Sequence, residues 1–277
     1  MIIGNAAWGF RETPLEKQLA ITKSMGCSIL ELHIASIPAD LIQMNATDTD
    51  ITRVKSLFAA NNIRLDYASI GNDFTSADEK QNYAALDAVK KKIDIAAKLG
   101  VKGIRIFAGF SAAKDVIGKR WNVMIDCLNK AAEYANPKGI FLAIETHGGV
   151  KKTDAGFIHM PSASTGKEPL ARMMNEIHPS LAFNYDPANV WAAERIAPEN
   201  VLSIIRPRVK YVHLKDYRVV KDDVVMPVGC GEGVLDWNTL LRSLTDYDGP
   251  AFIEYEPTED VEDGCKRSLM YLKHFTR

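Results

Sequence analysis

Residues 141–149 read FLAIETHGG, and this stretch decides how the rest of the chain is interpreted. Four apolar residues lead into Glu145, and His147 follows two positions later, before a pair of glycines. A short apolar run bounded in this way is typical of a buried strand, in which alternate side chains face the same side. Glu145 and His147 should therefore share one face where a strand leaves the core. The question is whether other strands end in the same way.

Short runs rich in β-forming residues alternate with longer helical patterns along the whole chain. The predicted strands are residues 1–8, 27–34, 63–70, 102–109, 140–147, 180–187, 209–216 and 249–256. The predicted helices are residues 14–25, 49–61, 78–99, 114–135, 166–177, 192–205, 236–245 and 259–275. The third of these helices shows the pattern best, since its apolar residues recur on one face and Gly100 is placed to end it.

The strict alternation of strands and helices predicts a parallel sheet connected by right-handed crossovers. Eight such units in 277 residues fit a (β/α)8 TIM barrel, formed by residues 1–277 as a single domain. The rival fold is a doubly wound open sheet, but its glycine fingerprint after the first strand is absent. No linker or low-complexity segment divides the chain.

Composition and net charge exclude several classes of function. The chain is 47% hydrophobic and 25% charged, which suits a soluble globular protein, and its net charge is −1. That charge gives no basic field for a nucleic acid or an anionic membrane. The four cysteines form no C-x-x-C pair, and no signal-like or membrane-spanning run is present. We therefore expect a cytoplasmic protein with neither a nucleic-acid nor a membrane partner.

Polar residues recur at the ends of the last four predicted barrel strands. In a (β/α)8 barrel the chemistry lies at the carboxyl ends of the strands, where inward side chains meet. The paired residues of equal parity are Glu145 and His147, Asn184 and Asp186, His213 and Lys215, and Glu254 and Glu256. Carboxylates gathered in one pocket repel one another unless a cation neutralises them. Carboxylates with one imidazole suit Mn²⁺, Co²⁺, Mg²⁺ or Zn²⁺, so we predict one bound divalent metal ion.

Other residues at this rim are candidates for substrate binding. His147 can hydrogen-bond a substrate hydroxyl or act as an acid, and it can equally orient a ligand. Lys215 can stabilise an enolate oxygen or a carboxylate, or be a solvated lysine. Arg105 can hold an anionic group, or pair with a barrel carboxylate. Trp8 can stack on a sugar face, or pack in the core. Glu256 shares the parity of Glu254 and is the alternative metal ligand if the strand register differs from the one predicted.

Two segments are long for this alternating pattern, residues 148–166 and 217–234. Long loops at the catalytic rim of a barrel often act as lids or as walls that set specificity. No glycine-rich phosphate loop occurs in the chain, so phosphorylation of the substrate is left open.

Five motifs resemble the xylose-isomerase-like TIM barrels, a group of sugar phosphate isomerases and epimerases. They are AIETHGG, FNYDPANVW, YVHLKDY, PVGCGEGVLDW and FIEYEP, and the resemblance covers nearly the whole chain. It implies a small carbohydrate substrate and one metal ion held by Glu145, Asp186, His213 and Glu254. Sugar 3-epimerases of this family commonly have a substrate-binding His three residues after the strand-six Asp. This chain has Asn189 there, which the resemblance makes a candidate substrate-binding residue. The family also contains dehydratases and apurinic endonucleases, so membership does not fix the reaction.

The resemblance favours an isomerase or epimerase of a small keto-sugar, polyol or sugar phosphate, whereas the residues themselves do not choose the reaction. A divalent ion polarises a carbonyl, and the neighbouring C–H becomes acidic enough to be removed, leaving an enediolate. Glu145 and Glu254 lie on different strands and can bracket the carbon, one removing a proton and the other returning one. Loss of a hydroxyl instead makes the protein a dehydratase of a keto-polyol, and a non-catalytic sugar-binding barrel is a further alternative. Helices of such barrels often pair, which leaves a homo-oligomer open.

Overall fold

A closed barrel of eight parallel strands forms the centre of the molecule. The computed structural model describes residues 1–37 and 40–275. The barrel strands, in sheet order, are β1 (Ile2–Asn5), β12 (Pro250–Ile253), β9 (Val209–Leu214), β8 (Ala182–Tyr185), β5 (Phe141–Glu145), β4 (Gly103–Ile106), β3 (Tyr67–Ser69) and β2 (Leu32–His33). The sheet closes where Asn5 pairs with Leu30, and the Glu31 N–H donates to the Asn5 carbonyl at 3.0 Å. The predicted (β/α)8 barrel is confirmed.

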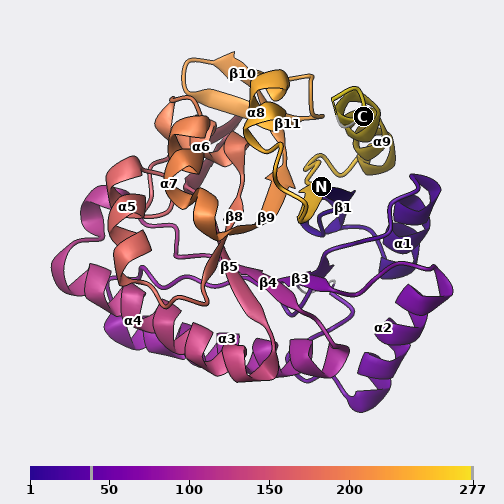
Figure 1. Cartoon of the computed structure of the whole chain (residues 1–277), viewed down its shortest axis with the longest axis horizontal. Helices are drawn as coiled ribbons and strands as arrows, with labels where there is room; N and C mark the ends of the chain where they lie inside the picture. Colours follow the sequence, from indigo (N-terminus) through magenta and orange to yellow (C-terminus); the bar gives the residue numbers. More distant parts are fainter. Residues whose placement is uncertain (38–39, 276–277) are drawn as a thin grey trace.

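Helices follow one another around the outside of the strands in chain order (Figure 1). They are α1 (Leu15–Ser24), α2 (Asp48–Ala60), α3 (Glu79–Leu99), α4 (Gly118–Ala135), α5 (Lys167–Glu176), α6 (Pro187–Glu194), α7 (Glu199–Ile205), α8 (Trp237–Ser243) and α9 (Val261–Leu272). Short 3₁₀ turns add η1 (Trp8–Phe10), η2 (Ala113–Asp115), η3 (Asn136–Lys138) and η4 (Arg206–Arg208). Gly100 ends α3 in the left-handed conformation, with φ 82°, as the sequence predicts.

One predicted helix, residues 192–205, is wrong. The structure has two helices in this region, α6 and α7, because the chain turns sharply between them. Arg195 adopts a left-handed φ of 55° after α6, and Pro198 precedes α7. Proline disfavours a helical residue before it and donates no hydrogen bond, so one continuous helix cannot run through this point.

Alternate strand residues separate the core into two layers. On β5, Leu142 and Ile144 pack outward against the helices, whereas Ala143 points into the barrel. The inward layer consists of Ala6, Ile29, Ala143, Ala182, Tyr211 and Phe252, with Tyr67 and Phe141 packed against it. The rings of Tyr211 and Phe252 stack at 4.8 Å, and Tyr67 meets both edge-on. These rings fill the barrel below its carboxyl end, and the next inward residues above them reach the rim.

A second, antiparallel sheet overlies that rim, and we call it the cap sheet. Its order is β10 (Asp216–Lys221), β11 (Val224–Val228), β7 (Gly156–Met160) and β6 (Gly149–Thr153). The two hairpins come from the long segments that follow β5 and β9. They are joined where Val224 pairs with Ile158 and Val225 pairs with Phe157. The sequence predicts long loops here but not their pairing.

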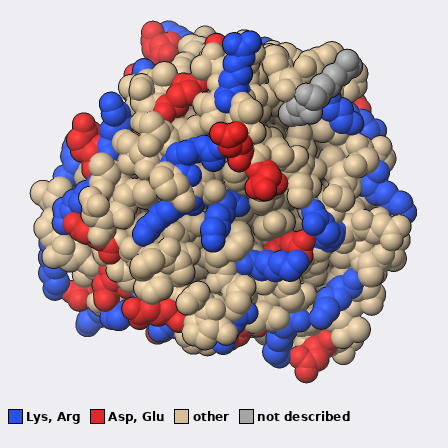
Figure 2. Space-filling view, viewed as in Figure 1, with Lys and Arg blue, Asp and Glu red and all other residues tan. Residues whose placement is uncertain are grey.

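The molecular surface carries no strong segregation of charge on the face seen in Figure 2, where basic and acidic side chains are interspersed. All four cysteines are buried and free. Within residues 1–37 and 40–275, no helix is both long and apolar enough to cross a membrane.

Candidate functional site

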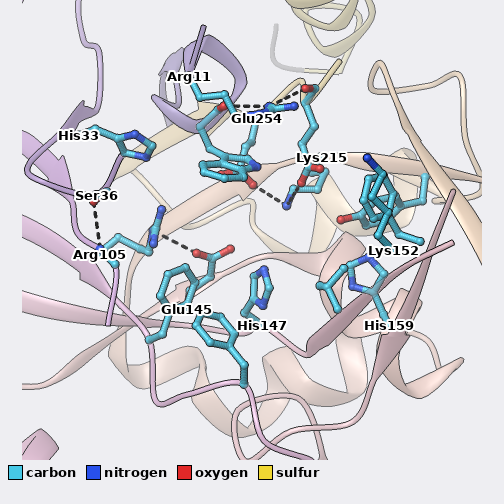
Figure 3. A pocket seen from close by; sticks show the side chains of 18 residues that line it. Arg11, His33, Ser36, Arg105, Glu145, His147, Lys152, His159, Lys215 and Glu254 are labelled. Carbon is cyan, nitrogen blue, oxygen red and sulfur yellow. Dashed lines mark hydrogen bonds and ion pairs between the residues drawn. The ribbon is translucent and has the colours of Figure 1, made fainter. Parts of the chain in front are cut away.

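A cavity of about 680 Å³ lies between the barrel rim and the cap sheet (Figure 3). The predicted site residues that line it are Trp8, Arg105, Glu145, His147, Lys215 and Glu254. The cap sheet contributes Val150, Lys152, Phe157, His159 and Tyr217. The two long segments thus form one wall of the cavity, as expected for segments that set specificity.

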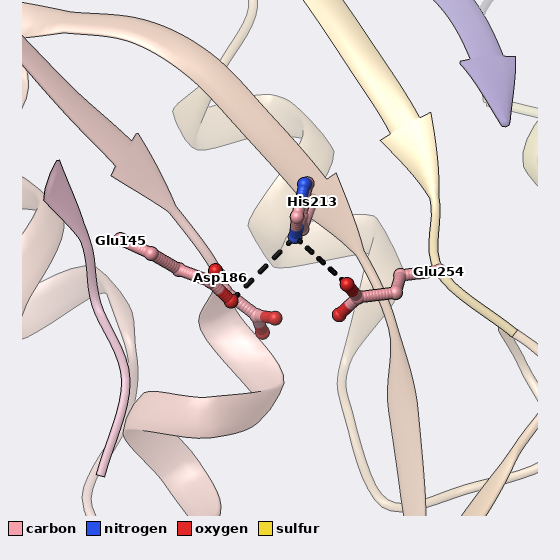
Figure 4. Close-up of side chains that lie close together, drawn as sticks. All are labelled: Glu145, Asp186, His213 and Glu254. Atoms are coloured by element: carbon pink, nitrogen blue, oxygen red, sulfur yellow. Dashed lines mark ion pairs between the residues drawn. The ribbon is translucent and has the colours of Figure 1, made fainter. Parts of the chain in front are cut away.

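Four potential metal ligands converge beside this cavity (Figure 4). They are Glu145 at the end of β5, Asp186 after β8, His213 on β9 and Glu254 after β12. One ligand atom from each lies within 4.8 Å of the others, and all four residues are buried. His213 Nδ1 is 3.6 Å from Glu145 Oε1 and 3.4 Å from Glu254 Oε1. The inward parity of the strand ends thus produces a compact group of three carboxylates and one imidazole.

Glu31 fixes the orientation of the His213 ring. Its Oε2 lies 3.2 Å from His213 Nε2 and accepts a hydrogen bond from the Tyr211 hydroxyl at 2.6 Å. A carboxylate on one imidazole nitrogen holds the proton there and leaves the other nitrogen free as a ligand. His213 therefore presents Nδ1 to the carboxylate group. Burial raises the pKa of Glu31, but His213, Arg105 and the Tyr211 hydroxyl together lower that pKa to about 2.

The chemistry of this group fits a divalent cation. His213 Nδ1 is buried without a hydrogen-bond partner in the described part of the chain, whereas Glu145 Oε2 and Glu254 Oε2 are in ion pairs with Arg105 and Lys215. Burial, together with the charges of Glu145 and Glu254, raises the pKa of Asp186 to about 7. A cation bound among these residues would relieve the repulsion that Asp186 meets from the two glutamates. Oxygen donors with one imidazole nitrogen match the ligands that Mn²⁺, Co²⁺, Mg²⁺ and Zn²⁺ take.

Two buried cations flank the ligand group. Lys215 Nζ lies 2.5 Å from Glu254 Oε2 and 2.8 Å from Glu256 Oε1. Arg105 Nε lies 3.1 Å from Glu145 Oε2. Burial raises the pKa of Glu254, yet Lys215 and His213 hold that pKa well below its usual range. Arg105 therefore pairs with a barrel carboxylate, which was the alternative to an anion-binding role. Neither Lys215 nor Arg105 is exposed to solvent.

Asn189 does not line the cavity, in contrast to its expected role as a substrate-binding residue. It is fully buried one turn into α6, where its N–H donates to Asp186 Oδ1 at 2.9 Å. Its Nδ2 donates to Asp186 Oδ2 at 2.9 Å and to Glu145 Oε1 at 3.1 Å. Its Oδ1 accepts from the Tyr217 hydroxyl at 3.2 Å and from Lys215 Nζ at 3.4 Å. Both ends of the amide are occupied by protein groups, so Asn189 positions the carboxylates.

His147 lines the cavity with one nitrogen already occupied. Its Nδ1 lies 2.6 Å from the Gly148 carbonyl, an acceptor that requires the proton on Nδ1. Phe107 and Phe110 contact the ring edge-on, at centroid distances of 5.1 and 5.4 Å. Burial lowers the pKa of this imidazole. Neutral His147 therefore keeps a lone pair on Nε2 that can accept a hydrogen bond.

Trp8 and three unpredicted residues complete the surroundings. Trp8 belongs to η1 and is 36% exposed at the cavity, so it does not pack in the core. Strand parity places Glu31 inward on the second predicted strand, residues 27–34, but the sequence does not identify it as the partner of His213. Arg11 gave no sequence signal. His159 lies on β7 and its buried Nδ1 has no partner among residues 1–37 and 40–275. Only the pairing of the hairpins, invisible in the sequence, brings His159 over the barrel.

The sequence and the fold of this chain are similar to those of known proteins. A sequence model of the xylose isomerase-like TIM barrel matches residues 19–274. No curated protein sequence matches the chain. The probable 3-DHS dehydratase AsbF from Bacillus anthracis is similar in structure, with a TM-score of 0.77, 15% identity and 99% of each chain covered.

Two further solved structures share the fold. The D-allulose 3-epimerase from a Methylomonas species has a TM-score of 0.76 and 18% identity, over 99% of this chain and 97% of that chain. A xylose isomerase-like TIM barrel protein from Mycobacterium smegmatis, in complex with magnesium, has a TM-score of 0.71 and 16% identity, over 99% and 95%. At these identities the likeness shows a common fold.

Proposed function

Because the chain belongs to the xylose isomerase-like TIM barrel family, we propose that it is a divalent-metal-dependent isomerase or epimerase of a small keto-sugar, polyol or sugar phosphate. The observation that carries the proposal is the convergence of three carboxylates and one imidazole at the rim, with His213 between Glu145 and Glu254. The D-allulose 3-epimerase that shares the fold supports the same class of reaction.

Glu145, Asp186, His213 and Glu254 would hold the metal ion. When bound, a divalent ion polarises the substrate carbonyl and makes the neighbouring C–H more acidic. The magnesium in the Mycobacterium smegmatis protein supports a hard cation of this kind. Mn²⁺, Co²⁺ and Zn²⁺ accept the same donors, so the choice of metal is left to experiment.

The proton transfers are proposed for the two glutamates. Strands β8 and β9 lie between β5 and β12, so Glu145 and Glu254 reach the substrate from separate sides of the rim. One carboxylate removes the proton next to the carbonyl and the other returns one. Return to the opposite face of the same carbon gives an epimer, and return to the neighbouring carbon gives an isomer. His147 Nε2 accepts from a substrate hydroxyl, and Trp8 packs on a sugar face.

Solvent exchange tests this proposal. The protein, loaded with Mn²⁺ or Co²⁺, is incubated in D₂O with ketoses, keto-inositols and their phosphates. An isomerase or epimerase puts solvent deuterium into a product that has otherwise the formula of its substrate. Glu145→Gln is the matched control, because it retains the shape of the side chain and loses its basicity. The absence of exchange with every substrate would contradict the proposal and favour a sugar-binding barrel.

A dehydratase is the second candidate, and Lys215 favours it. Its ammonium lines the cavity and lies 2.5 Å from Glu254, the proposed proton-transfer group, so it can stabilise the oxygen of a departing hydroxyl by a charged hydrogen bond. The probable 3-DHS dehydratase that shares the fold supports this alternative. Elimination breaks a C–H and a C–O bond and forms a carbon–carbon double bond. The same incubation would then give a product lighter by one water.

A further inference from the structure

The charges that line the cavity are not balanced by their neighbours. Four cationic side chains, Arg11, Arg105, Lys152 and Lys215, line it together with three carboxylates, Glu145, Glu254 and Glu256. The carboxylates are paired within the barrel, Glu145 with Arg105 and the other two with Lys215. Arg11 and Lys152 make no ion pair with any carboxylate among residues 1–37 and 40–275. Two positive charges at the mouth of the cavity are therefore left for a ligand.

Arg11 is held in place by groups that leave its charge intact. Its Nη1 donates to the Glu256 carbonyl at 2.7 Å and to the Trp8 carbonyl at 3.1 Å. The guanidinium lies 5.0 Å from the centre of the Trp8 ring. Neutral carbonyls and an aromatic face fix the group without neutralising it, while Nη2 and Nε make no hydrogen bond to the described residues. Figure 3 shows Arg11 at the cavity, across from the cap-sheet residues Lys152 and His159.

We infer that the substrate carries an anionic end group, a carboxylate or a phosphate, and that Arg11 binds it, with Lys152 adding charge from the cap sheet. The inference rests on the proposed function for the ketose part of the substrate. A guanidinium fixed on one side presents its remaining N–H groups in the planar arrangement that matches carboxylate or phosphate oxygens. A cavity of about 680 Å³ holds a hexulose together with such a group. The substrate class is therefore a sugar acid or a sugar phosphate.

Arg105 does not take this role, although it is the arginine that the sequence suggests for an anion. Its side chain is buried, is paired with Glu145 and lies 4.3 Å from the Phe107 ring centre. An anion that displaced Glu145 from Arg105 would leave a ligand carboxylate unpaired in the barrel, which is unfavourable. Arg11 has no such competitor.

Binding measurements test the inference without relying on turnover. The full chain, saturated with Mn²⁺, is titrated calorimetrically with D-fructose, its 6-phosphate and D-fructuronate, which share the configuration of D-fructose and differ in the group at C6. At least one anionic ketose should bind about ten- to a hundredfold more tightly than D-fructose. Arg11→Gln should remove that advantage while the affinity for D-fructose is retained. The tighter of the two anionic ligands identifies the end group as a phosphate or a carboxylate.

Two further variants keep the result interpretable. Arg11→Lys preserves the charge and should retain part of the advantage, which separates charge from folding. Arg53→Gln removes an exposed arginine on α2, away from the cavity, and should change nothing. Equal affinity for neutral and anionic ketoses, failure of both anionic ketoses to bind, or equal weakening of all ligands by Arg11→Gln would overturn the inference. Tight anion-dependent binding without deuterium exchange would retain it and refute the isomerase instead.

Discussion

His213 illustrates how a single residue depends on a partner from a distant strand. Its ring is oriented by Glu31, which precedes β2, so that Nδ1 rather than Nε2 faces Glu145 and Glu254. Glu31 in turn accepts from the Tyr211 hydroxyl, in the aromatic layer below. A carboxylate behind a ligand imidazole raises its basicity and fixes its tautomer. The affinity for the metal ion should therefore depend on a residue that never touches it.

Glu31→Gln should weaken metal binding by about 10- to 100-fold, because the charge behind the His213 ring is lost. Competition with a chromophoric chelator measures the affinity directly. Glu256→Gln is the matched control, since Glu256 contacts Lys215 and lies outside the four-residue group. Unchanged affinity in the Glu31 variant would show that the ring is oriented by packing alone. A large loss in the control would bring Glu256 into the ligand set.

The two proposed proton-transfer groups can be separated from their neighbour His147 by substitution. Glu145→Gln and Glu254→Gln should each lower kcat by orders of magnitude, since Gln binds the metal weakly and transfers no proton. His147→Ala should lower activity with the metal retained, because its Nδ1 is directed to the Gly148 carbonyl and away from the ligand group. Metal content is measured alongside turnover. Normal turnover of a metal-loaded Gln variant would exclude that residue from proton transfer.

At the scale of elements, the contact between the two hairpins of the cap sheet is weak, and we call this contact the seam. Each hairpin is held by several residue pairs, but β7 and β11 are joined through two pairs only. Gly156 stands at this seam with φ 148°, and a Cβ there would lie 2.5 Å from the Val225 carbonyl oxygen. A side chain at this position must therefore push the hairpins apart.

Gly156→Ala should loosen the seam and weaken substrate binding, while metal affinity stays as in the wild type. Hydrogen exchange should rise at the amides of β7 and β11, and the rest of the barrel should be unaffected. Gly139→Ala is the matched control, because Gly139 also has a positive φ, 72°, but a Cβ there meets nothing within 4 Å. Equal effects of both substitutions would show that backbone strain, rather than the contact with Val225, is responsible.

Some elements of the fold could be predicted from the sequence and others could not. The eight barrel strands were predictable because inward and outward residues alternate around one buried layer, as Leu142, Ala143 and Ile144 show. The same parity brought Glu145 and Glu254 to one rim. The cap sheet was not predictable, since its two hairpins are joined through two residue pairs and carry exposed residues such as Lys151. The sequence did not show that α6 begins immediately after Asp186, which places Asn189 in the first turn of a helix.

At the scale of the whole molecule, the buried carboxylates make stability depend on the metal ion. Three acidic side chains and one imidazole lie together with 0–3% of each residue exposed, so the folded state is penalised when no ion neutralises them. An ion that binds only the folded state adds stability in proportion to the logarithm of its concentration above Kd.

Removal of the metal with a chelator should lower Tm by about 8–16 °C. An ion at about a thousand times its Kd contributes about 4 kcal/mol, and each kcal/mol shifts Tm by about 2–4 °C for a chain of this size. Calorimetry of the chelated and the Mn²⁺-loaded protein measures the difference. In His213→Ala the metal-dependent shift should shrink toward zero. An equal shift in both proteins would mean that the stabilising ion binds elsewhere.

The aromatic layer of Tyr67, Tyr211 and Phe252 also has a kinetic consequence. It fills the barrel beneath the ligand group, while the cavity opens upward beside the cap sheet. Substrate and product then travel the same route in opposite directions, so each occupies the path of the other. The turnover rate at saturating substrate should be limited by product release and should fall as solvent viscosity rises. The product should inhibit competitively.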